Sequence, residues 1–298
     1  KLKVFPSKKA VKYKEYKSVN GGLLLTFEGN PEKVEVASVS ELLKDYKVMH
    51  QPKSDSVNVW FSMEKNDFPK EQLTNSFKLS YTTGTKSDTI PVNYKATKLD
   101  FKLASKEGNL VVPEAPFRII STLPLEKMNS DTWKLESDSI SQNFSAKISE
   151  KNPFEIVVNS DFKPTKKYVL SVPKETVYSY DASNDKSAYQ FEFEIDKPES
   201  YGGFKVTLQN KPSSKFWIEL LDEKGDVKYS KFTQESVIVF TNLKPGTYSA
   251  RLKVDNNGNG YWDEADFAQM QSAEDVYIFD KEIAIRPMWV IDENWNLN

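Results

Sequence analysis

The segment SVNVWFSM, residues 56–63, is a clear β-strand pattern and indicates the fold of the whole chain. Its apolar residues alternate between the two faces of an extended strand, with Val57, Val59 and Phe61 on one face and Trp60 on the other. The same short alternation recurs in VEVASV at 34–39 and SFKLSYTT at 76–83. Strands of this length, separated by Gly, Pro and Asn turns, are typical of β-sandwiches.

These strand patterns fall into successive sets, so we expect tandem β-sandwich domains and an all-β fold. A chain of 298 residues, at roughly 100 to 150 residues per domain, has room for two or three of them. The KPESYGG segment at 197–203, with its proline and paired glycines, marks a hinge before the last set. We predict sandwich domains at 18–98, 99–197 and 198–298, preceded by a Lys-rich arm or edge strand at 1–17.

Composition argues against several classes of function. The chain has 41 Lys and Arg against 43 Asp and Glu, a net charge of -2, which is not the basic footprint of a nucleic-acid-binding protein. It has no cysteine, which excludes disulfides, thiolate metal sites and a Cys nucleophile. A Ser-His-Asp triad would have to use the single histidine, His50, which lies far from any nucleophile motif.

Two features of the sequence bear on the location of the protein, namely its apolar runs and its first residues. No apolar run approaches the roughly 20 residues that a membrane helix needs. The first residues, KLKVFPSKKA, match neither a signal peptide nor a start methionine. We therefore keep a lipid anchor upstream of this segment as an expectation.

The loop-like segment VDNNGNGYWDEADF, residues 254–267, has the spacing of a calcium loop. An EF-hand loop places oxygen ligands at positions 1, 3, 5, 7, 9 and 12, with glycine at position 6. Counted from its first aspartate, with Gly260 sixth, the predicted ligands are Asp255, Asn257, Asn259, Tyr261 through its carbonyl, Asp263 and Asp266. With only three carboxylates and no bidentate glutamate at position 12, a structural Ca²⁺ would bind weakly, with a Kd of about 10⁻⁴ to 10⁻³ M.

The same residues fit a second interpretation without a cation. Asn and Gly build long hairpin turns in which side chains cap backbone amides. Both interpretations give the loop a structural role. A catalytic metal is not expected, because no histidine is near and Ca²⁺ activates water poorly.

The segment FTNLKPGTYSARLKVDNNGNGYWDEADF, residues 240–267, resembles the last domain of Ig-like-domain surface lipoproteins of Bacteroidota. The residues that carry the resemblance are Leu243, Pro245, Gly246, Tyr248, Arg251, Asp255, Asn257, Gly258, Asn259, Gly260, Trp262, Asp263, Trp289 and Trp295. Ala265 replaces a glycine of that pattern, and Gln271–Glu274 replaces its Gln-Pro-Glu segment.

The resemblance implies an Ig-like sandwich at 18–98, a bacterial Ig-like domain at 99–197 and a prealbumin-like sandwich at 198–298. It also implies a lipoprotein on the outer face of the outer membrane, with outer-membrane or cell-surface proteins as partners. Such a protein would be a non-enzymatic scaffold, for example an accessory subunit of the β-barrel assembly machinery. Sheet edges could bind partners by strand addition.

Two other functions remain open from the residues. Exposed tryptophans could bind carbohydrate, with Trp133, Trp217 and Trp262 as candidates. A hydrolase would need two carboxyls about 5 to 10 Å apart, for which the candidate pairs are Asp263 with Asp266 and Asp292 with Glu293. Near the C-terminus Trp289, Ile291 and Trp295 share strand parity, which predicts an aromatic row that fills a sandwich core or edge, or stacks on a sugar.

Overall fold

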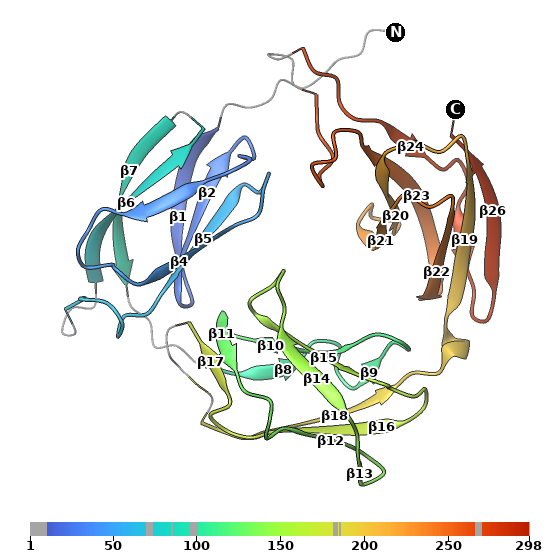
Figure 1. Cartoon of the computed structure of the whole chain (residues 1–298), viewed down its shortest axis with the longest axis horizontal. Helices are drawn as coiled ribbons and strands as arrows, with labels where there is room; N and C mark the ends of the chain where they lie inside the picture. The colour runs from blue at the N-terminus through green and yellow to red at the C-terminus, as the bar shows by residue number, and fades with distance from the viewer. Residues whose placement is uncertain are drawn as a thin grey trace. The chain divides into compact units, whose positions relative to one another are not determined.

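The structure, a computed structural model, describes residues 11–69, 74–84, 86–95, 101–180, 184, 186–265 and 270–297. Nearly every regular element in these ranges is a β-strand (Figure 1), which confirms the predicted all-β class. The one helical segment described is a short 3-10 turn, Pro198–Ser200. In the part of the chain that the structure describes, no helix has the length and apolar character needed to cross a membrane.

The chain forms two compact units, Lys9–Ile195 and Asp196–Asn298. Among the described residues the first unit has two hydrophobic cores and the second unit has one. Each core lies between β-sheets, as expected of β-sandwiches. We refer to these as the first sandwich (β1–β7), the second sandwich (β8–β18) and the third sandwich (β19–β26).

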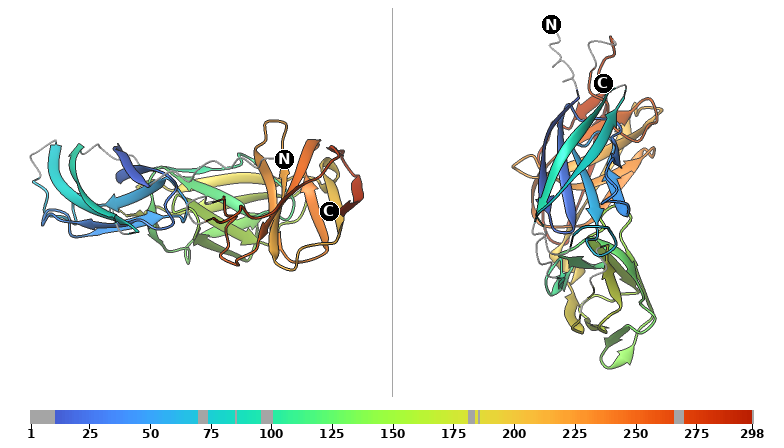
Figure 2. Two further views of the ribbon diagram at one scale, coloured as in Figure 1. Left: turned by 90° about the horizontal axis from the view of Figure 1, so that it is seen from above. Right: turned by 90° about the vertical axis from the view of Figure 1, so that its left-hand side faces the viewer.

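The first sandwich encloses its core with a four-stranded and a three-stranded antiparallel sheet. The first of these sheets has the order β1 (Lys12–Val19), β2 (Gly22–Glu28), β5 (Ser56–Phe61) and β4 (Tyr46–His50). The other has the order β3 (Glu35–Ser38), β6 (Thr74–Thr83) and β7 (Lys86–Lys95), and Figure 2 shows β6 and β7 as a long twisted hairpin. The lysine-rich strand β1 is therefore an edge strand.

Strand β5 shows the predicted alternation of residues 56–63. Val57, Val59 and Phe61 are buried in the core. The neighbouring strand approaches so closely that a Cβ on Gly22 would lie 2.1 Å from the carbonyl oxygen of Val59, so this position requires glycine.

Trp60 points away from this core and is nevertheless buried. It packs edge-on against Phe154 of the second sandwich, with ring centroids 5.4 Å apart. Its indole Nε1 has no hydrogen-bond partner among the described residues. Packing of the ring, rather than a hydrogen bond, is therefore what Trp60 contributes within the first unit.

Truncating this side chain should destabilise the first unit. We expect Trp60→Ala to lower its free energy of unfolding by about 3–5 kcal/mol, because a large buried ring leaves a cavity. Trp60→Phe should cost less than about 2 kcal/mol, since it keeps a ring and removes an N–H that has no partner. Urea unfolding of both variants measures the difference, and equal losses would contradict the packing role.

The second sandwich has two main sheets and a short two-stranded one. The five-stranded sheet has the order β13 (Ile140–Ser141), β12 (Lys134–Ser137), β16 (Lys167–Val172), β18 (Tyr189–Ile195) and β9 (Leu110–Val111). The four-stranded sheet has the order β14 (Phe144–Ile148), β15 (Glu155–Ser160), β10 (Phe117–Ser121) and β8 (Leu103–Ser105). The short one pairs β11 (Leu125–Met128) with β17 (Val177–Ser179). Phe117 and Phe193, from the two main sheets, stack with centroids 4.0 Å apart.

Glu155 is a buried carboxylate in this sandwich. Lys106 Nζ lies 2.7 Å from its Oε2, and Arg118 Nη1 donates a hydrogen bond to its Oε1. Burial alone would raise the pKa of Glu155, but the hydrogen bonds from Lys106 and Arg118 outweigh burial and hold that pKa below its ordinary value. The ionised form of Glu155 is therefore the one that the fold stabilises.

This pKa shift predicts a loss of stability in acid. The contribution of Glu155 is complete above the pKa of an unfolded glutamate, about 4.3, and is lost as the pH falls through the lower folded value. Glu155→Gln should cost about 2 kcal/mol at neutral pH and should make stability less dependent on pH in the acid range. Urea unfolding at several pH values tests this, with the exposed Glu150 changed to Gln as the control. An unchanged acid slope in Glu155→Gln would contradict the assignment.

The third sandwich also has two sheets. The smaller one has the order β22 (Val237–Leu243), β19 (Gly202–Gln209) and β26 (Val290–Asn296), with β19 and β26 parallel. The larger one has the order β21 (Val227–Thr233), β20 (Lys215–Leu221), β23 (Gly246–Asp255) and β24 (Val276–Ile278), and β25 (Ile283–Ile285) pairs with the other end of β23.

The C-terminal aromatic row is only partly what the sequence predicts. Trp295 is buried in the core of the third sandwich, where its ring lies 5.2 Å from that of Phe279. Trp289 is 65 % exposed, so the core alternative is wrong for this residue, and the edge and sugar-stacking alternatives stay predictions. The reason is that β26 begins at Val290, whereas Trp289 belongs to a turn held by its carbonyl, which accepts a hydrogen bond from Gly203 N.

Candidate functional site

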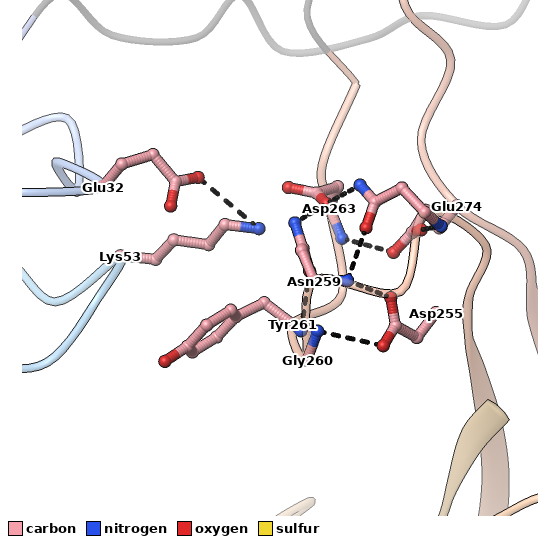
Figure 3. A network of polar contacts seen from close by, with 9 residues as sticks. Glu32, Lys53, Asp255, Asn259, Gly260, Tyr261, Asp263 and Glu274 are labelled. Carbon is pink, nitrogen blue, oxygen red and sulfur yellow. Dashed lines mark hydrogen bonds and ion pairs between the residues drawn. The ribbon is translucent and has the colours of Figure 1, made fainter.

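The predicted calcium loop lies between β23 and β24 of the third sandwich. These strands pair antiparallel, with Lys253 opposite Val276, and the described residues 256–265 and 270–275 lie at the end of this strand pair. Side chains at both ends of the connection turn back onto its backbone (Figure 3). The loop is thus held by its own hydrogen bonds.

Asp255 caps the first half of the loop. It is buried at the end of β23, where Oδ1 accepts a hydrogen bond from Asn259 N at 3.1 Å and Oδ2 accepts one from Gly260 N at 3.0 Å. Gly260 has a φ of +81°, a conformation that suits glycine and turns the chain back. Both carboxylate oxygens of Asp255 are thereby engaged by the loop backbone.

Glu274 caps the same loop from its far end. Its Oε1 accepts hydrogen bonds from Asn256 N at 2.6 Å and Asn257 N at 3.2 Å, and its Oε2 accepts one from Asp263 N at 2.9 Å. The side chain is buried. The linear ligand pattern missed this residue, because it lies beyond the twelve-residue frame and reaches the loop only through the pairing of β23 with β24.

The loop amides converge on Asp263. Its Oδ2 accepts hydrogen bonds from Asn257 Nδ2 at 2.7 Å and Asn259 Nδ2 at 2.8 Å. The amide oxygens point elsewhere, since Asn257 Oδ1 accepts from Asn259 N and Asn259 Oδ1 accepts from Tyr261 N. Three side chains of the predicted site are therefore satisfied without a cation.

Five of the six predicted ligands lie in this one loop, and the sixth, Asp266, is outside the described residues. Among the residues that are described, no group of three His, Cys, Asp or Glu side chains is arranged to hold a metal ion. The observed hydrogen bonds are those of the capped hairpin, and a cation would require Asn257 and Asn259 to turn their oxygens inward. Calcium binding at this loop stays a prediction.

A second feature lies on the outward face of the adjoining sheet β21-β20-β23-β24. The strand register places Phe232, Trp217, Lys253 and Val276 in one row across four strands. Trp217 and Phe232 stack with ring centroids 4.4 Å apart. Lys253 Nζ lies 5.5 Å from the centre of the Trp262 ring, which therefore flanks Lys253 from the loop. We call Trp217, Phe232, Lys253 and Trp262 the aromatic face.

Three cationic side chains lie beside the aromatic face. Lys215 Nζ lies 5.7 Å from the centre of the Phe232 ring. Arg251 Nε and Lys253 Nζ lie 2.5 Å and 3.7 Å from the same oxygen, Oε2 of Glu219. One carboxylate is therefore shared by two cations.

The structure brings together only two of the three tryptophans predicted to bind carbohydrate. Trp217 and Trp262 flank the same lysine at the aromatic face. Trp133 is buried in the second sandwich, where its Nε1 donates to Thr176 Oγ1 at 2.9 Å, so the prediction that it is exposed is wrong. The reason is that its large apolar ring packs among the hydrophobic side chains of that core.

The carboxylate pair Asp292 and Glu293 does not face a common space. The two residues are adjacent on β26, and neighbouring residues of a strand point to opposite faces. Asp292 forms an ion pair with Lys205 at 2.7 Å, and Glu293 forms one with Lys281 at 2.6 Å. These carboxylates therefore stabilise the surfaces of the third sandwich rather than form a hydrolase pair.

Comparison with known proteins identifies no family. No protein-family model and no curated protein matches this chain. Three solved structures illustrate the distant similarities. The major pilin subunit of Bacillus cereus is 10% identical, with 74% of this chain and 85% of that chain covered and a TM-score of 0.22. Surface layer protein SbsC, domains 4–9, is 11% identical over 96% of this chain and 48% of that chain, with a TM-score of 0.25.

The third is SGBP-B of the mixed-linkage glucan utilization locus of Bacteroides ovatus, solved with a mixed-linkage heptasaccharide. It is 13% identical over 98% of this chain and 69% of that chain, with a TM-score of 0.20. Likeness of this degree identifies neither a family nor a function.

The calcium prediction can be tested by thermal unfolding. A ligand that binds only the folded state raises stability by RT ln(1 + [L]/Kd), so about 10 mM Ca²⁺ with a Kd of about 1 mM should add about 1.4 kcal/mol. The melting temperature is compared in Ca²⁺ and in EDTA, for the native chain and for Asp263→Asn. The exposed Glu264 changed to Gln is the control. An unchanged melting temperature would leave the capped hairpin as the whole explanation of the loop.

Proposed function

We propose that this chain is a non-enzymatic protein of the cell envelope that scaffolds or binds other macromolecules. The observation that carries the proposal is the aromatic face, where partly exposed rings and cations lie in register on a rigid sheet. Aromatic residues and arginine are enriched at binding surfaces because they bury much area with few rotatable bonds. The described residues offer this arrangement for non-covalent recognition.

In its finer form, the proposal is an outer-membrane lipoprotein that faces outward and serves an outer-membrane complex such as the β-barrel assembly machinery. The support is the resemblance of residues 240–267 to surface lipoproteins of Bacteroidota. A lipid anchor upstream would tether the chain, and the sandwiches would present binding surfaces to neighbouring membrane proteins.

Strand β22 is the best-suited edge for a partner protein. It is an edge strand of its sheet, with the uncharged sequence VIVFTNL and exposed side chains at Val237 and Val239. Lys231 Nζ donates a hydrogen bond to the carbonyl oxygen of Val239 and so covers part of the edge. A partner strand that replaced this lysine would extend the sheet by β-augmentation.

Carbohydrate binding is the second candidate, and one observation favours it. Trp217 and Trp262 come from a strand and a loop, yet both flank Lys253 on one outward face. Rings on a flat face can stack on sugar rings while the intervening polar groups bind hydroxyls. This candidate is compatible with a surface location and also requires no catalytic residue.

Partner binding at β22 can be tested with a backbone change. Because the Val239 carbonyl turns outward to Lys231, the N–H of Val239 also points to the open edge, and proline there removes no bond to β19. Val239→Pro should abolish capture of outer-membrane proteins from detergent-extracted native membranes, measured by mass spectrometry.

Val239→Thr, which keeps the N–H, is the matched control and should capture the same proteins. Melting curves of both variants confirm that the third sandwich remains folded. Recovery of the native chain only as a free monomer would contradict the accessory-subunit proposal, and unchanged capture by Val239→Pro would exclude β22 as the edge that is used.

A further inference from the structure

We propose that the aromatic face and its flanking cations bind an acidic polysaccharide. This inference rests on the carbohydrate-binding function proposed above and adds the chemical class of the ligand. The rings would contact the flat faces of sugars, and the cations would pair with carboxylates of uronic-acid residues. Both kinds of group lie on one outward face of the third sandwich.

The rings form an extended surface rather than a single stacking point. Phe232 is 44 % exposed and stacks on Trp217, and the interplanar angle of 27° leaves the two rings nearly parallel. The Trp262 ring lies against Lys253, with Nζ 5.5 Å from the ring centre. Adjacent strands are about 4.8 Å apart, so the row from β21 to β24 spans about 14 Å, which is longer than one sugar ring.

The charge of the face argues for an anionic ligand. The ionisable residues on the outward side of β20 and β23 in this area are Lys215, Glu219, Arg251, Lys253 and Asp255, of which Asp255 is buried under the loop. Three positive charges therefore meet two negative ones, and Arg251 and Lys253 both pair with the same Glu219 oxygen. An incoming carboxylate would meet the side chains of Lys215, Arg251 and Lys253 beside the rings.

The carboxylates of the acidic loop beside the face keep their negative charge but are directed at donors within the loop. The carboxylates of Asp255 and Glu274 are buried and accept hydrogen bonds from loop N–H groups. Asp263 accepts hydrogen bonds from the amides of Asn257 and Asn259. The loop acids are thus directed at loop donors, whereas Lys215 and Lys253 lie against the exposed rings.

The test uses polygalacturonate as the probe and carboxyl-reduced polygalacturonate as its neutral match. Binding is measured by affinity electrophoresis and calorimetry at low and high salt. The native chain should bind the acidic polymer at least about tenfold more tightly than the reduced one, and salt should weaken binding because the ion pairs are exposed. Phe232→Ala should lower affinity for both polymers.

Lys215→Gln combined with Lys253→Gln should lower affinity for the acidic polymer alone. Lys205→Gln, on the outward face of the opposite sheet, is the matched control and should bind like the native chain. Melting curves verify that every variant is folded.

The outcomes separate the two proposals. Equal binding of both polymers overturns the acidic preference and leaves carbohydrate binding standing. If the native chain binds neither polymer, both the acidic preference and carbohydrate binding are overturned. If Phe232→Ala then also fails to capture a membrane protein that the native chain captures, the face is a protein interface. If Phe232→Ala binds the polymers as tightly as the native chain does, the binding site is not at the aromatic face.

Discussion

The burial of alternate side chains between two sheets is the constraint on which this structure depends. In each sandwich the inward residues of the central strands meet those of the facing sheet, as Val57 and Val59 do in the first sandwich. Because a strand has a period of two, burying one face commits the intervening residues to the outside. The outward faces and their chemistry are therefore consequences of how the cores are packed.

That constraint also creates the aromatic face. Phe216 and Ile218 are fully buried in the third sandwich, which forces Trp217 outward between them. Pairing with β21 and β23 then places Phe232 and Lys253 on either side of Trp217. No helix, cleft or catalytic group is needed to assemble these side chains, since the sheet register alone brings them together.

The loop beside the face illustrates how residues next to paired strands hold the backbone of residues 256–263. Asp255 and Glu274 flank the loop next to paired strands and cap its backbone from two directions. Buried carboxylates are costly unless N–H donors surround them, and here the loop itself supplies those donors. The capped backbone therefore holds Trp262 beside Lys253. The aromatic face thus depends on the hydrogen bonds that Asp255 and Glu274 accept from the loop.

The sequence by itself determined the all-β class and the inward residues of strands such as β5, because alternation with period two is local. It also located the 254–267 loop and most of its capping residues, since Asp, Asn and Gly spacing encodes turn geometry within a few positions. Tertiary structure alone decided that Trp133 and Trp295 are buried while Trp289 is exposed, because burial depends on which strand ends where and on what faces it. It likewise decided that Glu274 joins the loop and that Trp217, Phe232 and Trp262 share a surface. Such residues are far apart in the chain and meet only through strand pairing, which the local pattern does not encode.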